Sequence, residues 1–356
     1  MKLAKNLRLK NISFKENVVL SKITYARTGG NAKYTFYPNN IAEFIELVLF
    51  LRENSIAFRV VGNSTNTLFL DSVNYLCLIF VSQLNDISIN GAITSVECGR
   101  NVSDLVRDLS MHQLTGAEGL EGIPGTLGGA LIMNAGAYGY TISDYLVDVH
   151  VLTPNNKVKV LSKSDITFKN REAKELKNNI ILSARFNFPK GSYSTIEKKV
   201  RRFHISRHQY QEWVYPNLGS IFVVPSLNIH KEVLSYSKFK HKWKVLFIKS
   251  LIKLFTNRFM FILRRCYPEI NFQQLSIKLL NLNSYNNELA SRTTINTFTN
   301  KKASSMDILK YIYEVYCDTG KKLKIENEII TDSIDKIVSE ENYNCELGLL
   351  NKINGE

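Results

Sequence analysis

Residues 116–139 read GAEGLEGIPGTLGGALIMNAGAYG and hold eight of the eighteen glycines of the chain. Glycine tolerates positive φ and lets a flat or charged group approach the backbone, so a glycine-dense turn can present a row of N–H groups to a phosphate. The stretch combines a Pro-Gly turn with a Gly-Gly pair and an apolar run that fits a short buried helix or strand. We therefore consider it a candidate nucleotide-binding loop.

A second loop of this kind, VGNSTNTL at residues 61–68, follows the strand-like run AFRVV. Its Ser, Thr and Asn side chains can hydrogen-bond phosphate or ribose oxygens. Each loop alone is more typical of a structural turn, and neither matches GxGxxG after a strand or GxxxxGK[ST]. Two such loops in one domain favour a nucleotide cofactor.

Length and composition limit the class of protein. The chain has 356 residues, of which 44% are hydrophobic and 11% aromatic, which suffices for a sizeable core in two or three domains. The five cysteines form no CxxC pair, and we expect neither a disulfide framework nor a metal site. The first twenty residues are basic, but Lys, Asn and Glu interrupt their apolar runs, unlike a signal peptide. We therefore expect a cytoplasmic protein.

The net charge of +14 is concentrated in one segment. Residues 233–268 contain nine Lys and Arg and no acid, so subtracting nine from fourteen leaves +5 for the rest of the chain. A charge this local argues against a nucleic-acid-binding fold, and no recognition module is evident. We expect no nucleic acid among the partners, and no feature of the sequence sets the oligomeric state.

Local patterns predict an α+β architecture. Helices are expected at 39–56, 196–211 and 306–320. Strands are expected in AFRVVG (57–62), YLCLIFVS (75–82), VDVHVLTPNNKVKVL (147–161, with a hairpin turn at PNN), NIILSARFNF (179–188), IFVV (221–224) and LKIENEII (323–330). The composition shifts after PKGS, which indicates a domain boundary near 190–195.

The run GIPGTLGGALIMNAGAYG resembles the signature of the UDP-N-acetylenolpyruvoylglucosamine reductase (MurB) family. Further segments match that family in order: RTGG (27–30), GNSTN (62–66), NREA (170–173), YPNLGSIFVVP (215–225), NKKASSMDIL (300–309) and IENEII (325–330). The resemblance covers about residues 20–225 and 295–330.

The resemblance implies a fold and a reaction. The fold is a two-part FAD-binding region of the vanillyl-alcohol-oxidase (PCMH) type, followed by a MurB-like substrate domain. The corresponding division is 1–75 and 76–192 for the FAD-binding subdomains, 193–335 for the substrate domain with a divergent basic insertion at about 230–295, and 336–356 for a tail. In the family, hydride passes from NADPH to FAD and then to the enolpyruvyl ether of a UDP-sugar, in peptidoglycan precursor synthesis.

The resemblance also implies the cofactor-binding residues. They are Gly62, Asn63, Ser64, Thr65 and Asn66 in the first loop, and Gly122, Ile123, Pro124, Gly125, Thr126, Gly128, Gly129, Asn134, Gly136 and Ala137 in the second.

The chemistry of the reduction defines which groups the substrate-binding side of the site must supply. Hydride addition to an enol ether conjugated with a carboxylate builds negative charge on that carboxylate, and the adjacent carbon then needs a proton. The resemblance implies Arg171 as the cation, Glu328 as its acidic partner and Ser220 as the proton donor. Without the resemblance, these residues have ordinary structural interpretations. Arg171 lies in FKNREAKELKN, which is typical of a solvated helix; Ser220 is typical of a turn residue, and Glu328 of an exposed position in a strand.

Departures from the family pattern concentrate on the substrate and nicotinamide side. Asn170 replaces the family's Tyr, Glu172 and Ala173 replace Asp-Ser, and Val223 and Val224 replace Lys-Asn. In the first loop, Ser64 and Thr65 replace Gly and Ser. An apolar side chain cannot replace a hydrogen bond to a charged ligand, and each unpaired polar group costs about 1–3 kcal/mol. The substrate is therefore bound more weakly, or it differs.

The basic segment permits several interpretations. Residues 237–265 carry too many charges to span a bilayer, where about 20 mostly apolar residues are needed. They fit a helix lying on an anionic membrane, a docking helix for an acidic partner, or an enlarged substrate domain with solvated lysines.

Three hypotheses of function follow. The first is the peptidoglycan reductase itself. The second is a flavin oxidoreductase of the same fold with another nucleotide-sugar or other substrate, and the third is a non-catalytic flavin-binding relative.

Overall fold

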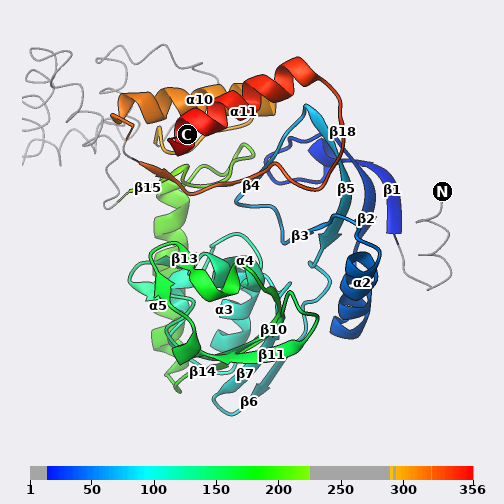
Figure 1. The fold of residues 1–356 in the computed structure, drawn as a ribbon. Coiled ribbons are helices and arrows are strands. Elements are labelled where there is room, and N and C mark those ends of the chain that lie inside the picture. The colour runs from blue at the N-terminus through cyan, green and yellow to red at the C-terminus, as the bar shows by residue number, and fades with distance from the viewer. Residues whose placement is uncertain (1–13, 225–288, 292–293, 322, 356) are drawn as a thin grey trace, which may run out of the picture.

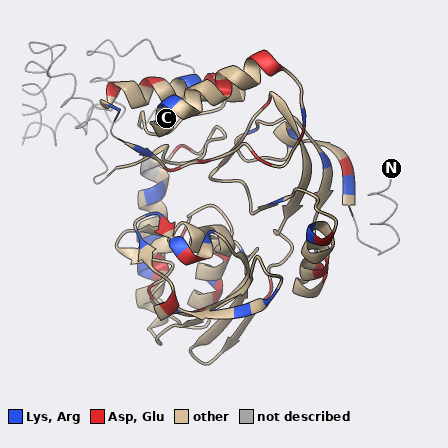
Figure 2. Cartoon of the chain, in the orientation of Figure 1, with Lys and Arg blue, Asp and Glu red and all other residues tan. Residues whose placement is uncertain are grey.

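The computed structural model describes residues 14–224, 289–291, 294–321 and 323–355. Two β-sheets occupy separate parts of the molecule, and two long helices pack together at the top of the view (Figure 1). Lys and Arg are interspersed with Asp and Glu over the described elements (Figure 2). The basic segment 237–265 lies outside the described residues, as does most of the expected insertion at about 230–295.

The first sheet contains the most apolar strand of the chain. Its order is β1-β2-β5-β18, and β3 also pairs with β5. The strands are β1 (Phe14–Val19), β2 (Asn31–Phe36), β3 (Arg59–Val61), β5 (Val73–Phe80) and β18 (Ile334–Ile337). β5 is apolar on both faces because each face meets a different hydrophobic core: Cys77 and Ile79 belong to one core, and Leu78 and Phe80 to the other.

Helix α2 (Ile41–Glu53) packs into the first of these cores through Phe44, Leu47 and Leu51. The helix begins after Asn40, whose side chain accepts a hydrogen bond from the backbone N–H of Glu43 at 2.9 Å. This cap satisfies one of the unpaired donors at the helix start.

The second sheet is antiparallel throughout, in the order β11-β10-β14-β7-β6. Its strands are β6 (Ile87–Asn90), β7 (Ile93–Glu97), β10 (Leu146–Leu152), β11 (Val158–Ser162) and β14 (Ile180–Asn187). Helices α3 (Val102–Met111) and α4 (Leu127–Ile132) bury apolar faces in the same core as this sheet. The 3-10 turns within the described residues are η1 (Leu20–Lys22), η2 (Glu118–Leu120), η3 (Lys163–Asp165) and η4 (Lys174–Leu176).

The C-terminal part of the chain returns to the first sheet. Helix α5 (Tyr193–Tyr210) leads away from the second sheet, and α10 (Ser305–Asp318) packs against α11 (Glu340–Asn354). β17 (Glu328–Ile330) pairs in parallel with β4 (Thr67–Phe69), and β18 pairs antiparallel with β5. The remaining two-stranded ladders join β8 (Gly136–Ala137) to β9 (Tyr140–Thr141), β12 (Phe168–Lys169) to β13 (Glu172–Ala173), and β15 (Phe222–Val223) to β16 (Lys324–Ile325).

These pairings differ from the division implied by the resemblance. The boundary at 75/76 falls inside β5, whose continuous apolar run continues the first sheet to Phe80. Residues 328–335, expected in the substrate domain, contribute to two ladders with the N-terminal part of the chain: β17 pairs with β4 in a two-stranded ladder of its own, and β18 pairs with β5 of the first sheet. The expected tail 336–356 contains α11, which buries Leu350 and Ile353 in the second core.

Most local expectations are confirmed, with two exceptions. α2, α5 and α10 occur at the predicted helices, and β10–β11 form the predicted hairpin. LKIENEII is wrong as one strand, because Glu326 and Asn327 interrupt it between β16 and β17. FKNREAKELKN is not a helix: it forms the β12–β13 hairpin with Arg171 at φ +57° in the turn.

No helix among the described residues is long and apolar enough to cross a membrane.

Candidate active site

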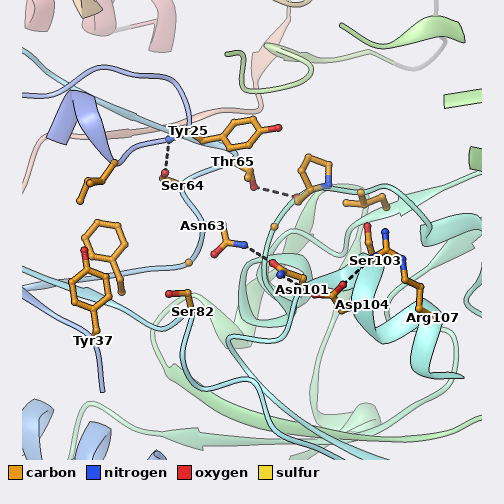
Figure 3. Close-up of a pocket in the computed structure, with 16 residues that line it drawn as sticks. Tyr25, Tyr37, Asn63, Ser64, Thr65, Ser82, Asn101, Ser103, Asp104 and Arg107 are labelled. Atoms are coloured by element: carbon orange, nitrogen blue, oxygen red, sulfur yellow. Dashed lines mark hydrogen bonds and ion pairs between the residues drawn. The ribbon is translucent and has the colours of Figure 1, made fainter. Parts of the chain in front are cut away.

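A cavity of about 550 Å³ is lined by residues of both glycine-rich loops (Figure 3). Gly62, Asn63, Ser64 and Thr65 line one side, and Ile123, Pro124 and Gly125 line the other. The volume falls within the range of ordinary small-molecule sites. The two loops, about sixty residues apart in the chain, thus form one site.

The two loops contact each other directly. Thr65 Oγ1 donates a hydrogen bond to the carbonyl of Pro124 at 3.1 Å. The first loop also contacts the start of α3, where Asn63 Nδ2 donates to Asn101 Oδ1 at 2.5 Å. Gly125 has φ +124°, and a Cβ there would stand 2.8 Å from Thr65 Oγ1. This close approach requires glycine, both for the positive φ and for the space.

The first loop offers donors that suit a diphosphate. The backbone N–H groups of Asn63, Ser64 and Thr65 donate to none of the described residues. Ser64 has φ +52°, so successive N–H groups change direction as they do in anion-binding nests. Uncommitted backbone amides and a glycine-lined approach in one cavity fit the phosphates of FAD.

The other cofactor-binding residues implied by the resemblance are not among the residues that line the cavity. Gly128 packs on Cys98, where an added Cβ would meet the Cys98 Cβ at 3.3 Å. Asn134 donates to the carbonyl of Lys169 at 3.2 Å and accepts from Ser143 Oγ at 2.8 Å. Asn66, Gly122, Thr126, Gly129, Gly136 and Ala137 are likewise not among the lining residues.

Several lining residues were not predicted from the sequence. These are Ile23, Tyr25, Tyr37, Phe80, Ser82, Asn101, Ser103, Asp104 and Arg107. Arg107 and Asp104 form an ion pair one helical turn apart on α3 at 3.0 Å. Asn101 stands at the N-cap position of α3, a helix that was not predicted from the sequence, and the tyrosines carry no local pattern that separates them from core aromatics.

Arg171 meets a different acid from the one implied by the resemblance. Its Nε lies 2.8 Å from Glu326 Oε1, whereas Glu328 pairs with Arg59. The side chain of Glu326 is 13% exposed and that of Glu328 is 49% exposed. The register explains the difference, because Glu328 lies opposite Thr67 on the β17–β4 ladder while Glu326 precedes that ladder.

Burial raises the pKa of Glu326, and the neighbouring Arg171 guanidinium lowers it in part. A carboxyl group of this kind keeps its proton more readily than an exposed one. The pair therefore combines a cation with a weakly acidic partner.

Backbone hydrogen bonds bring the implied proton donor to the same place. The N–H of Glu326 donates to the carbonyl of Ile221 at 2.7 Å, and the N–H of Glu328 donates to the carbonyl of Asn66 at 2.9 Å. Ser220, next to Ile221, is exposed, and Gly219 before it has φ +70°. Segments from three distant parts of the chain therefore meet beside the first loop.

The altered family positions have structural roles in this chain. Val223 pairs with Lys324 on the β15–β16 ladder, and Val224 packs against the second hydrophobic core. Glu172 forms an ion pair with Lys177 at 2.7 Å, and Ala173 is fully buried.

Among the described residues, no group of three or more His, Cys, Asp or Glu side chains is placed to hold a metal ion.

Helix α5 fixes the second loop from outside the cavity. Arg207 is 6% exposed and donates through Nε to the carbonyl of Glu121 at 2.8 Å. A Cβ added to Gly122 would lie only 2.8 Å from Cδ of Arg207. Burial lowers the pKa of Arg207, and the guanidinium also lies 5.5 Å from the ring centre of Tyr138.

Comparisons with known proteins agree with this geometry. The FAD binding domain family matches residues 32–162, which contain both glycine-rich loops. The protein named UDP-N-acetylenolpyruvoylglucosamine reductase of Streptococcus pyogenes serotype M1 is 34% identical over 218 residues, covering 61% of this chain and 74% of that protein. The protein of the same name from Streptococcus uberis is 32% identical over 233 residues, covering 65% of this chain and 77% of that protein.

One solved structure extends the likeness to the C-terminal part. The UDP-N-acetylenolpyruvylglucosamine reductase (MurB) of Thermus caldophilus superposes with a TM-score of 0.63 at 19% identity, covering 89% of this chain and 99% of that one. The two chains share a fold.

Proposed function

The chain belongs to the UDP-N-acetylenolpyruvoylglucosamine reductase family, and on that premise we propose that it reduces UDP-N-acetylglucosamine enolpyruvate to UDP-N-acetylmuramic acid with FAD and NADPH. The family is one of FAD-dependent oxidoreductases. The observation that carries the proposal is the meeting of the Arg171–Glu326 pair, the Ser220 turn and the first loop. A cation and a hydroxyl beside a flavin-binding loop are what this reduction requires.

FAD, when bound, supplies the hydride relay between NADPH and the enolpyruvyl ether. In our proposal the first loop binds its phosphates through the N–H groups of Asn63, Ser64 and Thr65. The second loop, held in place by Arg207, closes the other side of the cavity.

Arg171 would stabilise the substrate carboxylate as negative charge develops there. Its guanidinium lies on a two-residue turn and is oriented by Glu326, so little reorganisation is needed when charge appears. We keep Glu328, paired with Arg59, as a second acid bordering the site.

Ser220 would deliver the proton to the carbon next to the carboxylate. A serine hydroxyl is a weak acid, so this role needs a closed site with little water. Ser220 is exposed in this structure, and the proposal therefore includes closure of the substrate domain on binding.

An anaerobic two-step assay tests the function. The oxidised flavin spectrum is recorded, NADPH is added, and the enolpyruvyl substrate follows. Bleaching followed by return of the oxidised spectrum is the expected result. Bleaching without return would contradict the proposed substrate, and a flavin that never bleaches would contradict reduction by NADPH.

A specific observation favours a second candidate, a flavin oxidoreductase acting on another nucleotide-sugar. Val223 and Val224 occupy positions where the family has polar residues, and they are committed to a ladder and a core. If the assay shows bleaching without return, a panel of other UDP-linked enol ethers and enones becomes the acceptor test, and reoxidation by one of them would establish this candidate.

We also propose a cytoplasmic protein that contacts anionic membranes through residues 237–265. The support is their charge, with Lys and Arg and no acid. Sedimentation with vesicles that contain anionic lipid, at low and high salt, tests this contact. Binding that ignores lipid charge and salt would contradict it.

A further inference from the structure

A buried side-chain amide lies where the three segments of the site meet. Asn327 stands between β16 and β17 and is 5% exposed. Its Nδ2 donates to Asn66 Oδ1 at 2.8 Å, to the carbonyl of Leu218 at 3.1 Å and to the carbonyl of Ser220 at 3.2 Å. One amide group therefore contacts both the first loop (residues 61–68), called the flavin-binding loop from here on, and the turn that carries Ser220.

The orientation of this amide is fixed by its surroundings. All three neighbours of Nδ2 are oxygen acceptors, so a reversed amide would place Oδ1 against three oxygens. Oδ1 itself is buried and accepts no hydrogen bond from the described residues. An unpaired buried acceptor is costly, and its presence indicates that the donor side is what this position requires.

Asn66 also hydrogen-bonds the residues on either side of Asn327. Its Nδ2 donates to the carbonyl of Glu326 at 3.1 Å, and its carbonyl accepts from the N–H of Glu328 at 2.9 Å. Asn327 and Asn66 thus bridge the flavin-binding loop and residues 326–328 by three hydrogen bonds. The contacts to Leu218 and Ser220 connect the Gly219 turn to this bridge.

Resting on the proposed function, we propose that Asn327 is a positioning residue that holds the Ser220 turn in register with the flavin-binding loop. It touches neither substrate nor cofactor in this assignment and acts through Ser220 and Asn66. A displacement of about 1 Å in a reacting group can cost about 10²-fold in rate. Loss of the amide should therefore slow the step that uses Ser220 and leave flavin reduction by NADPH nearly unchanged.

The experiment is a kinetic cycle with Asn327→Ala, Ser220→Ala and the double variant, measured by anaerobic stopped flow for each half-reaction. Asn327→Ala should slow flavin reoxidation by the enolpyruvyl substrate by about 10²-fold and change flavin reduction less than about threefold. In the Ser220→Ala background, Asn327→Ala should slow flavin reoxidation little further, because the Ser220 hydroxyl through which Asn327 is proposed to act is already absent. An undiminished effect in that background would overturn the proposal, as would equal slowing of both half-reactions.

A matched control separates positioning from general loss of stability. Asn300 is also 5% exposed, and its Nδ2 donates to the carbonyl of Ala26 at 2.7 Å. Its backbone N–H, which alanine keeps, donates to the carbonyl of Pro216 at 2.7 Å, whereas its side-chain Oδ1 accepts from the N–H groups of Lys302 and Ala303 and not from Ser220 or the first loop. Asn300→Ala should lower the melting temperature without changing the ratio of the two half-reaction rates. If it changes that ratio as Asn327→Ala does, positioning by Asn327 is overturned.

A second readout does not depend on the substrate. FAD binding to the apoprotein, followed by flavin fluorescence, should weaken by about fivefold in Asn327→Ala, since Asn66 loses one hydrogen bond, and stay unchanged in Asn300→Ala. If the wild-type flavin is not reoxidised by the enolpyruvyl substrate, the proposed function fails, yet the FAD affinities still test the bridge. Equal FAD affinities of wild type and Asn327→Ala would overturn the link to the flavin-binding loop.

Discussion

The flavin side and the substrate side of the site are held by different kinds of contact. On the flavin side, two loops meet through backbone carbonyls and glycine positions, as in the approach of Gly125 to Thr65. On the substrate side, the backbone N–H groups of Glu326 and Glu328 also connect the segments, and side chains add the link from Glu326 to Arg171 and from Asn327 to the Ser220 turn. The approach at Gly125 therefore leaves no room for a side chain, whereas the links of Glu326 and Asn327 depend on which side chains stand there.

Removal of the Ser220 hydroxyl should have the largest effect and should affect only the substrate side. A positioned general acid contributes about 10²–10⁴-fold to a rate. Ser220→Ala should slow flavin reoxidation by the enolpyruvyl substrate by that factor and leave reduction by NADPH unchanged, both measured by anaerobic stopped flow. Ser194→Ala, an exposed serine on α5, should alter neither rate. Equal loss of both half-reactions would indicate structural damage instead.

A methyl group on the flavin side should act on cofactor affinity. Gly125→Ala would place a Cβ 2.8 Å from Thr65 Oγ1 at φ +124°, so the loops must separate. We expect FAD to bind about tenfold more weakly, or about 1.4 kcal/mol, as measured by flavin fluorescence titration. Gly139→Ala is the matched control, because its φ is +84° but no atom lies within 4 Å of the added Cβ. The same loss of affinity in both variants would show that strain, and not the closeness of the loops, is responsible.

Arg171→Met should make stability depend on pH. Burial raises the pKa of Glu326 and Arg171 opposes the rise, so removal of Arg171 raises that pKa further. A carboxyl whose folded pKa is raised stabilises the fold below its unfolded pKa, and this stability is lost as pH rises through the folded pKa. The variant should lose about 1–3 kcal/mol relative to wild type at pH 8 and less at pH 5, by urea unfolding. Adding Glu326→Gln should remove the difference between the two pH values.

The smallest expected effect lies away from the site. Glu346 on α11 is 1% exposed and accepts hydrogen bonds from Ser72 and Ser305, while burial raises its pKa. By the same sign rule, Glu346 weakens the fold as pH rises through its folded pKa. Glu346→Gln should therefore be about 1 kcal/mol more stable than wild type at pH 8 and equal to it at pH 4. Glu341→Gln, exposed on the same helix, should show no such dependence.

The sequence predicted local elements better than long-range pairings. α2 and the β10–β11 hairpin follow from patterns of adjacent residues, and the two glycine-rich loops, both expected to bind the cofactor, line one cavity. The partner of Arg171 was predicted as Glu328 but is Glu326, because the choice depends on a β17–β4 register between residues about 260 apart. Asn327 could not be predicted, since a lone Asn in a polar stretch is indistinguishable from a solvated one until its three acceptors are placed around it.

The return of the C-terminal strands to the first sheet also affects how the protein is made. β18 pairs with β5, so the β5 edge facing it stays open until residue 337 has been synthesised. The second sheet, complete by residue 187, can fold earlier on the ribosome. The flavin-binding loop borders β4, whose ladder partner β17 is also made late. Cofactor loading is therefore expected to follow synthesis of residues 328–337, when the second sheet can already be folded.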